Sequence, residues 1–64
     1  MKDILKELRK EKGLSQKDVA DAIGVTRGAY ANYEQGTREP SLDILIKICR
    51  FFNTTPNYLL GFEY

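Results

Sequence analysis

The apolar residues of the chain recur at the three- and four-residue spacing of helices, and no segment alternates as a strand would. The pattern predicts five helices, over residues 2–12, 16–23, 27–35, 42–52 and 56–62. The expected fold class is therefore all-α, a compact five-helix domain that takes in residues 1–64 as a single unit.

Local signals mark the ends of these helices. Residues of N-cap type precede the second to fifth helices: Ser15, Thr26, Ser41 and Thr55. Asp18 stands three residues after the first of them, where a capping box places an acidic group, and Pro56 fits the first turn of the last helix. Residues suited to a left-handed C-terminal position follow the first four helices: Gly13, Gly24, Gly36 and Asn53.

The fourth predicted helix is apolar nearly all round. Its two apolar faces comprise Leu42, Leu45, Cys49 and Phe52 on one side and Ile44, Ile48 and Phe51 on the other. Since helices of this kind are usually buried, we expect residues 42–52 to form the central element.

The second and third helices are short and are joined by "GVT", residues 24–26. A turn of this length that contains glycine is typical of a helix-turn-helix. The hairpin by itself leaves two interpretations open, a DNA reader and an ordinary helical bundle.

Composition narrows the class of protein. The chain has 64 residues, of which 42% are hydrophobic and 30% are charged, as in a compact folded domain. No apolar run is long enough to span a membrane, and the charged start "MKDILKELRKEK" is not a signal peptide. The lone Cys49 cannot form an internal disulfide, which fits a reducing cytoplasm, and we expect it to fill space in the core.

The same composition argues against an enzyme. Histidine is absent, so His-based triads and His-containing zinc sites are excluded, and Cys49 has no histidine partner that would make it a nucleophile. We expect no catalytic residue, no metal and no cofactor. Nothing in the sequence indicates a small-molecule effector. The net charge of +1 is low for a nucleic-acid binder, so such a function depends on where the charges lie.

The third helix has two unlike sides on a helical wheel. Ala29, Tyr30 and Tyr33 fall together and predict an inward face. The opposite arc contains three long polar side chains separated by two small residues: Arg27, Gly28, Ala31, Asn32 and Gln35.

This slim arc suits the major groove of DNA, which is about 12 Å wide. Arg27 could pair with the O6 and N7 atoms of a guanine, Asn32 with the N6 and N7 atoms of an adenine, and Ala31 could contact a thymine methyl. Gly28 costs the helix up to about 1 kcal/mol relative to alanine, which a close approach to bases would justify. The alternative is that the arc is a solvent face with indifferent residues.

Beyond the arc, the sequence from "LRKEKGLSQKDVADAIGV" through "YEQG" and "REPS" to "NTTPNYLL" resembles the Cro/CI-type (XRE) helix-turn-helix domain of phage repressors and bacterial regulators. The resemblance covers nearly the whole chain and implies a lambda-repressor-like fold and a sequence-specific transcriptional regulator, expected to be a repressor. It places Thr26, Arg27, Gly28 and Asn32 at positions that face bases or adjacent phosphates. Gly28 departs from the family, because many relatives have a polar reader there.

Other roles follow from the same resemblance. Gln16 corresponds to the family glutamine that meets a phosphate and braces the reading helix, and a loop after that helix touches the DNA backbone, partly through amide N–H groups. The full set of expected phosphate contacts is Gln16, Lys17, Gln35, Gly36, Thr37 and Arg38. Arg9 and Glu34 correspond to an internal ion pair, and a solvated Glu34 is the alternative.

One subunit with few phosphate contacts should bind double-stranded DNA weakly, so we expect a homodimer, at least on DNA, at a pseudo-palindromic operator. Candidate interface residues are Phe51, Pro56, Asn57, Phe62 and Tyr64, with core packing as the alternative for the apolar ones, Phe51 above all. We expect a cytoplasmic, bacterial or phage-encoded protein. Alternative functions are an antitoxin or restriction-modification controller on the same fold, and a protein-interaction module that has lost DNA binding.

Overall fold

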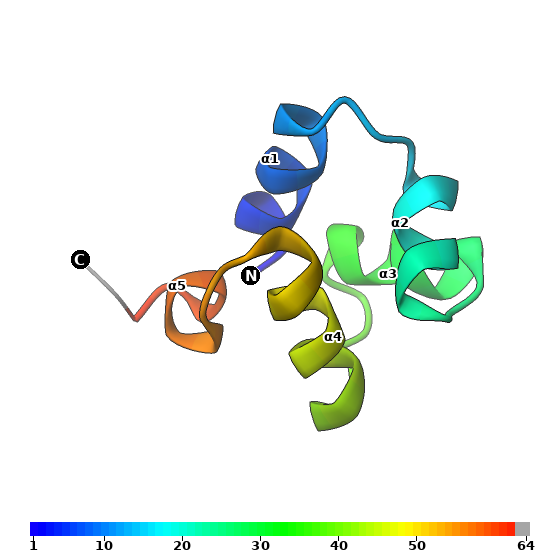
Figure 1. Ribbon diagram of the computed structural model, residues 1–64. Coiled ribbons are helices and arrows are strands. Elements are labelled where there is room, and N and C mark those ends of the chain that lie inside the picture. The colour runs from blue at the N-terminus through cyan, green and yellow to red at the C-terminus, as the bar shows by residue number, and fades with distance from the viewer. Residues whose placement is uncertain (63–64) are drawn as a thin grey trace.

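The computed structural model describes residues 1–62 and contains, within that range, five helices and no strand (Figure 1). The helices are α1 (Lys2–Glu11), α2 (Gln16–Ile23), α3 (Arg27–Gln35), α4 (Leu42–Phe52) and α5 (Pro56–Leu60). The all-α prediction is therefore confirmed, and the predicted bounds of α2, α3 and α4 are met to the residue.

Short polar side chains start four of the helices. The hydroxyl oxygens of Ser15, Thr26, Ser41 and Thr55 each accept a hydrogen bond from the backbone N–H three residues later. The capping box is complete, since the Asp18 carboxylate accepts from the Ser15 N–H at 2.9 Å. These local bonds satisfy N–H groups that a helix start would otherwise leave unpaired.

Two predicted ends were too late. α1 ends at Glu11 rather than at residue 12. α5 ends at Leu60, because Gly61 adopts a left-handed conformation with φ of 84° and closes the helix. Phe62 therefore follows the helix instead of extending it.

The core lies where the helices meet. Its buried hydrophobic members come from all five helices: Leu5, Val19, Ala20, Ile23, Tyr30, Tyr33, Ile48, Cys49, Phe52 and Leu59. Cys49 is buried among them as a free thiol, in line with its expected role as filler, and burial raises the pKa of that thiol.

The expectation that α4 is buried nearly all round was wrong. Both predicted apolar faces contribute to the core, since Ile48, Cys49 and Phe52 are buried. Leu42, however, is 72% exposed and Ile46 is 38% exposed. In a molecule of about 30 × 23 × 19 Å no further layer lies outside α4 to cover a second face. α4 is thus an outer element whose side with Leu42 and Ile46 stays at the surface.

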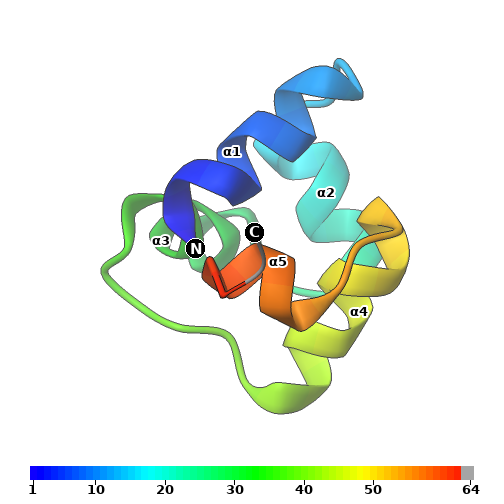
Figure 2. The same cartoon turned by 90° about the vertical axis from the view of Figure 1, so that its left-hand side faces the viewer.

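The arrangement leaves α3 accessible. α2 packs against both α3 and α4, and α1 also packs against α3. Figure 2 shows the connection from α3 to α4 as an extended loop at the edge of the molecule. Among residues 1–62 no helix has the length and apolar character to cross a membrane.

Candidate nucleic-acid interface

α3 is held to the domain by its two tyrosines. Tyr30 is fully buried and Tyr33 is 8% exposed, and their rings pack edge to face with centroids 6.3 Å apart. Such pairs add about 0.5–1.5 kcal/mol to the stabilisation from area burial alone. The helix is therefore fixed in rotation about its own axis.

The opposite side of α3 is not covered by the described residues. We call this side the outward ridge; its members are Arg27, Gly28, Ala31, Asn32 and Gln35. Arg27, Gly28 and Gln35 are exposed, and Ala31 and Asn32 are partly exposed. A Cβ atom added at Gly28 would meet nothing within 4 Å, so no neighbouring side chain requires the glycine. The predicted slim polar ridge is thus present at the surface.

A second anchor joins α3 to α1. The Arg9 Nε atom donates to Glu34 Oε2 at 2.7 Å, and a terminal nitrogen donates to Glu34 Oε1 at 3.1 Å. The other terminal nitrogen donates to the Leu14 carbonyl at 2.8 Å, so one guanidinium links α1, the turn after it and α3. The Glu34 side chain is 1% exposed and that of Arg9 is 14% exposed. The predicted ion pair exists, and the solvated alternative for Glu34 is wrong.

Gln16 completes this anchor. Its Nε2 atom donates to Glu34 Oε1 at 3.2 Å, which braces α3 from the start of α2. Burial opposes ionisation of the Glu34 carboxyl, but the hydrogen bonds from Arg9 and its other neighbours outweigh that effect and hold its pKa below the ordinary 4.5. The carboxylate is therefore charged at neutral pH.

The Tyr30 hydroxyl lies beside the same pair. It is buried and has no hydrogen-bond partner among residues 1–62. Burial, together with the nearby Glu34 charge, raises the pKa of Tyr30 far above its usual value. The phenol stays neutral in the folded protein.

Thr26 is the residue directly before α3. Its hydroxyl oxygen accepts from the Ala29 N–H at 3.1 Å and so caps the helix. Its hydroxyl hydrogen remains available to donate outward. Thr26 is exposed, next to Arg27 at the start of the ridge.

The loop after α3 uses its own amides internally. The Gly36 N–H donates to the Tyr33 carbonyl at 3.3 Å, and the Thr37 N–H donates to the Asn32 carbonyl at 3.1 Å. The Thr37 hydroxyl also donates to that Asn32 carbonyl, at 3.3 Å. A phosphate contact through these donors would first have to break the end of α3. Arg38, in the same loop, has an exposed guanidinium that can donate to a phosphate.

Lys17 has a competing partner. Its Nζ atom lies 2.8 Å from an Asp21 carboxylate oxygen, and the hydrogen bond raises the pKa of Lys17. Both side chains are well exposed, so this pair is worth little and can exchange for another anion.

One cation was missed by the sequence reasoning. A Cβ atom built on Gly36 would lie 3.0 Å from the Cδ atom of Lys2, so the stem of this lysine crosses the C-terminal end of α3. Lys2 is thereby brought beside the loop that carries Arg38. The one hint in the sequence was Gly36, because a glycine lets another side chain pack closely against the backbone. Lys2 itself could not be singled out, because it lies in a run of charged residues at the start of the chain.

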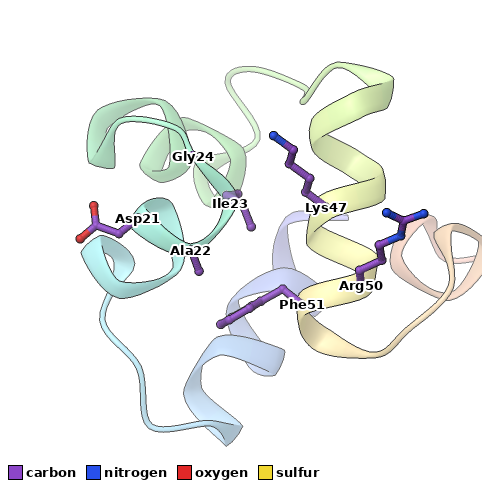
Figure 3. Close-up of a pocket in the computed structure, with 7 residues that line it drawn as sticks. All are labelled: Asp21, Ala22, Ile23, Gly24, Lys47, Arg50 and Phe51. Atoms are coloured by element: carbon purple, nitrogen blue, oxygen red, sulfur yellow. The ribbon is translucent and has the colours of Figure 1, made fainter.

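The candidate interface residues do not gather on one surface. Pro56, Asn57 and Phe62 are exposed in or directly after α5. Phe51 instead points from α4 toward α2, on the side away from α5 (Figure 3). Tyr64 lies outside the described residues. Within the described part of the chain, no group of three or more His, Cys, Asp or Glu residues is placed to hold a metal ion.

Comparisons with known proteins agree with this geometry. The sequence profile described as Helix-turn-helix matches residues 5–59. The chain is 46% identical over 59 residues to the uncharacterized HTH-type transcriptional regulator YqaE of Bacillus subtilis (strain 168), covering 92% of this chain and 51% of YqaE. It is 46% identical over 61 residues to the HTH-type transcriptional regulator AnsR of the same organism, covering 95% of this chain and 53% of AnsR. The chain thus spans about half the length of these relatives.

A solved structure shares the fold. The P22 c2 repressor, crystallised in complex with a synthetic operator, superposes with a TM-score of 0.91 over 97% of this chain and 94% of its own. The two sequences are 22% identical, so the likeness concerns the arrangement of the helices.

Proposed function

The chain belongs to the Cro/CI-type (XRE) helix-turn-helix family, and on that premise we propose that it is a sequence-specific DNA-binding regulator of transcription that acts as a repressor. It acts by occupying an operator and carries out no catalytic step. The names of its relatives support regulation, and the structural neighbour supports repression by operator binding.

The observation that carries this proposal is the uncovered outward ridge on a helix whose other side is fixed. Because Tyr30, Tyr33 and Glu34 are buried, α3 can enter a groove without tilting or rolling. Arg27 and Asn32 then read base edges directly, and Gly28 and Ala31 allow the helix axis to approach them. Each good bidentate contact is worth about 1–3 kcal/mol of discrimination.

Contacts to the DNA backbone set the register of α3. We assign them to Arg38 and Lys2 at one end of the helix and to Gln16 and Lys17 at the start of α2, with Gln35 at the last turn. Gln16 keeps one N–H free after bracing Glu34, so it can meet a phosphate and hold α3 together. Such contacts carry no sequence information and weaken as salt rises.

One subunit supplies few of these contacts, so the proposal includes a homodimer on a pseudo-palindromic site, with the two α3 helices about 34 Å apart. The exposed residues in and after α5 form the proposed contact, namely Pro56, Asn57 and Phe62, and the exposed Tyr58 and Leu60 extend its apolar area. We place the protein in the cytoplasm of a bacterium, because the named relatives come from a bacterium.

Selection of bound sites from random duplexes tests the proposal. The expected result is one preferred sequence with two-fold symmetry and half-sites one helical turn apart. Gel-shift titrations at several salt concentrations should then show a steep loss of affinity with salt. A protein without sequence preference and without a salt slope would contradict the proposal and favour a protein-interaction module.

A further inference from the structure

A hollow of about 500 Å³ lies between α2 and α4 and shares no residue with the outward ridge. It is lined by Asp21, Ala22, Ile23, Gly24, Lys47, Arg50 and Phe51 (Figure 3). We propose that this hollow is the docking site for an acidic segment of a partner protein, which inserts one apolar side chain between α2 and α4.

The floor of the hollow is apolar and firmly held. Figure 3 shows Phe51 reaching from α4 toward α2, with Ala22 and Ile23 on the facing helix. The Phe51 ring packs edge to face on the buried Phe52, with centroids 5.0 Å apart, and it remains partly exposed. An aromatic ring that is fixed before binding loses little conformational entropy when a partner covers it.

The rim carries positive charge, and its cations form no ion pair with the described residues. Lys47 and Arg50 are exposed and, within residues 1–62, neither has a carboxylate within 4.0 Å. They stand three residues apart on α4, and Phe51 lies four residues after Lys47, so the three side chains share one helix face. Lys12 adds a third cation, with its Nζ atom 5.7 Å from the centre of the Phe51 ring.

The carboxylate of the hollow does not balance these cations. Asp21 is turned away from the hollow and is bound to Lys17 at 2.8 Å. A partner that brings carboxylates would therefore meet a surface of complementary charge, and its apolar side chain would meet the aromatic floor.

The open shape favours a protein segment over a small molecule. A small-ligand pocket buries most of the surface of its ligand, whereas this hollow is open between the two helices (Figure 3). A polypeptide brings its own surface to close such a site. Duplex DNA is a poorer occupant, because phosphates gain nothing from the partly exposed Phe51 and the exposed Ala22.

The test uses peptide display. The protein is immobilised and a library of random dodecapeptides is selected on it; the strongest recovered peptide is then synthesised and titrated while backbone amide NMR shifts are followed. The expected peptides combine several Asp or Glu residues with one large apolar residue. Their shifts should centre on residues 21–24 and 47–51.

Charge reversals supply the control. Lys47→Glu and Arg50→Glu should each weaken peptide binding by about tenfold or more, whereas Lys6→Glu, which reverses an exposed cation on α1, should change it by about twofold or less. Circular dichroism checks that each variant remains folded. Duplex binding, measured in parallel, should be affected equally by Lys47→Glu and Lys6→Glu.

Four results would overturn the inference. They are recovery of peptides without acidic enrichment, equal losses from the Lys6 and Lys47 reversals, the same shifts produced by acetate alone, and a selective loss of duplex binding in Lys47→Glu. The last result would assign the cations to DNA. None of the four decides whether α3 reads DNA, because the selection of random duplexes measures that separately.

Discussion

Arg9 and Glu34 are 25 residues apart in sequence, and two hydrogen bonds of 2.7 and 3.1 Å join their side chains. The pair ties the last turn of α3 to α1 and, through Leu14, to the turn before α2. It therefore fixes the helix that presents the outward ridge, although neither residue lies on that ridge.

Replacement of Arg9 alone should be severely destabilising. Arg9→Leu leaves the buried Glu34 carboxylate without its counter-charge, and we expect a loss of about 3–5 kcal/mol in the free energy of unfolding, measured with urea. The double variant Arg9→Leu/Glu34→Leu should recover much of this loss, because no charge is then stranded. Lys17→Ala, which breaks the exposed pair with Asp21, should change the free energy of unfolding very little. Similar losses from Arg9→Leu and Lys17→Ala would contradict this assignment.

Acid should weaken the fold through Glu34. The pKa of this carboxyl is lower in the folded protein than its ordinary 4.5, so its stabilisation is present above that value and is lost as pH falls below it. Unfolding curves recorded from neutral pH downward should show this loss. Glu34→Gln should lower stability at neutral pH and flatten the acid dependence; an unchanged slope would show that other carboxyls, such as the capping Asp18, dominate.

Alkali should act through Tyr30. Its pKa is raised by burial, so the folded state disfavours the phenolate and stability should fall as pH rises above 10, where the unfolded phenol ionises. Tyr30→Phe should reduce this alkaline loss. Because the hydroxyl has no hydrogen-bond partner among the described residues, the same change should alter stability at neutral pH by less than about 1 kcal/mol. A larger loss in urea denaturation would reveal a bond that the hydroxyl makes.

Two glycines with equally open surroundings should respond in opposite ways. A Cβ atom would meet nothing within 4 Å at either Gly28 or Gly24, but Gly24 has a φ of 76° and Gly28 lies in ordinary helix. Gly28→Ala should raise the free energy of unfolding by up to about 1 kcal/mol, seen as a higher melting temperature, and reduce affinity for the selected duplex. Gly24→Ala should lower stability by about 1–2 kcal/mol. Gain of both stability and affinity in Gly28→Ala would show that the low profile has no role in binding.

The two exposed arginines should separate reading from attachment. Arg27→Ala should relax preference at one base position of the selected site, at a cost of about 1–3 kcal/mol for the preferred base. Arg38→Ala should weaken binding to all duplexes alike and reduce the salt slope by about one unit. Competition binding against a panel of single-base variants measures both effects. Uniform losses from both changes would contradict the division of roles.

Local chemistry explains why the helix starts were predictable. Ser15, Thr26, Ser41 and Thr55 cap through bonds that reach three residues, so neighbouring sequence determines them. The end of α5 was missed although Gly61 carried a C-terminal signal, because apolar residues on both sides suggested continuation. The exposure of Leu42 depends on how many layers surround α4, which periodicity does not report.

The candidate site also contains features that the sequence predicted and features that it did not. The two sides of α3 followed from the helical period, and the Arg9–Glu34 pair followed from family resemblance, so both could be anticipated. The position of Lys2 over Gly36 depends on the packing of α1 against the end of α3, and the hollow depends on the packing of α4 against α2. Contacts of that kind require the tertiary structure.

α3 consists of an anchored half, with the buried Tyr30, Tyr33 and Glu34, and the outward ridge. This division has an evolutionary consequence. The side chains of the outward ridge are at least partly exposed, and a Cβ atom at Gly28 would meet nothing within 4 Å, so most substitutions there should change the stability of the domain little. A duplicated copy of this gene could therefore drift to a new target sequence in single steps, each of which leaves a viable protein. The anchored half would stay nearly constant among such descendants.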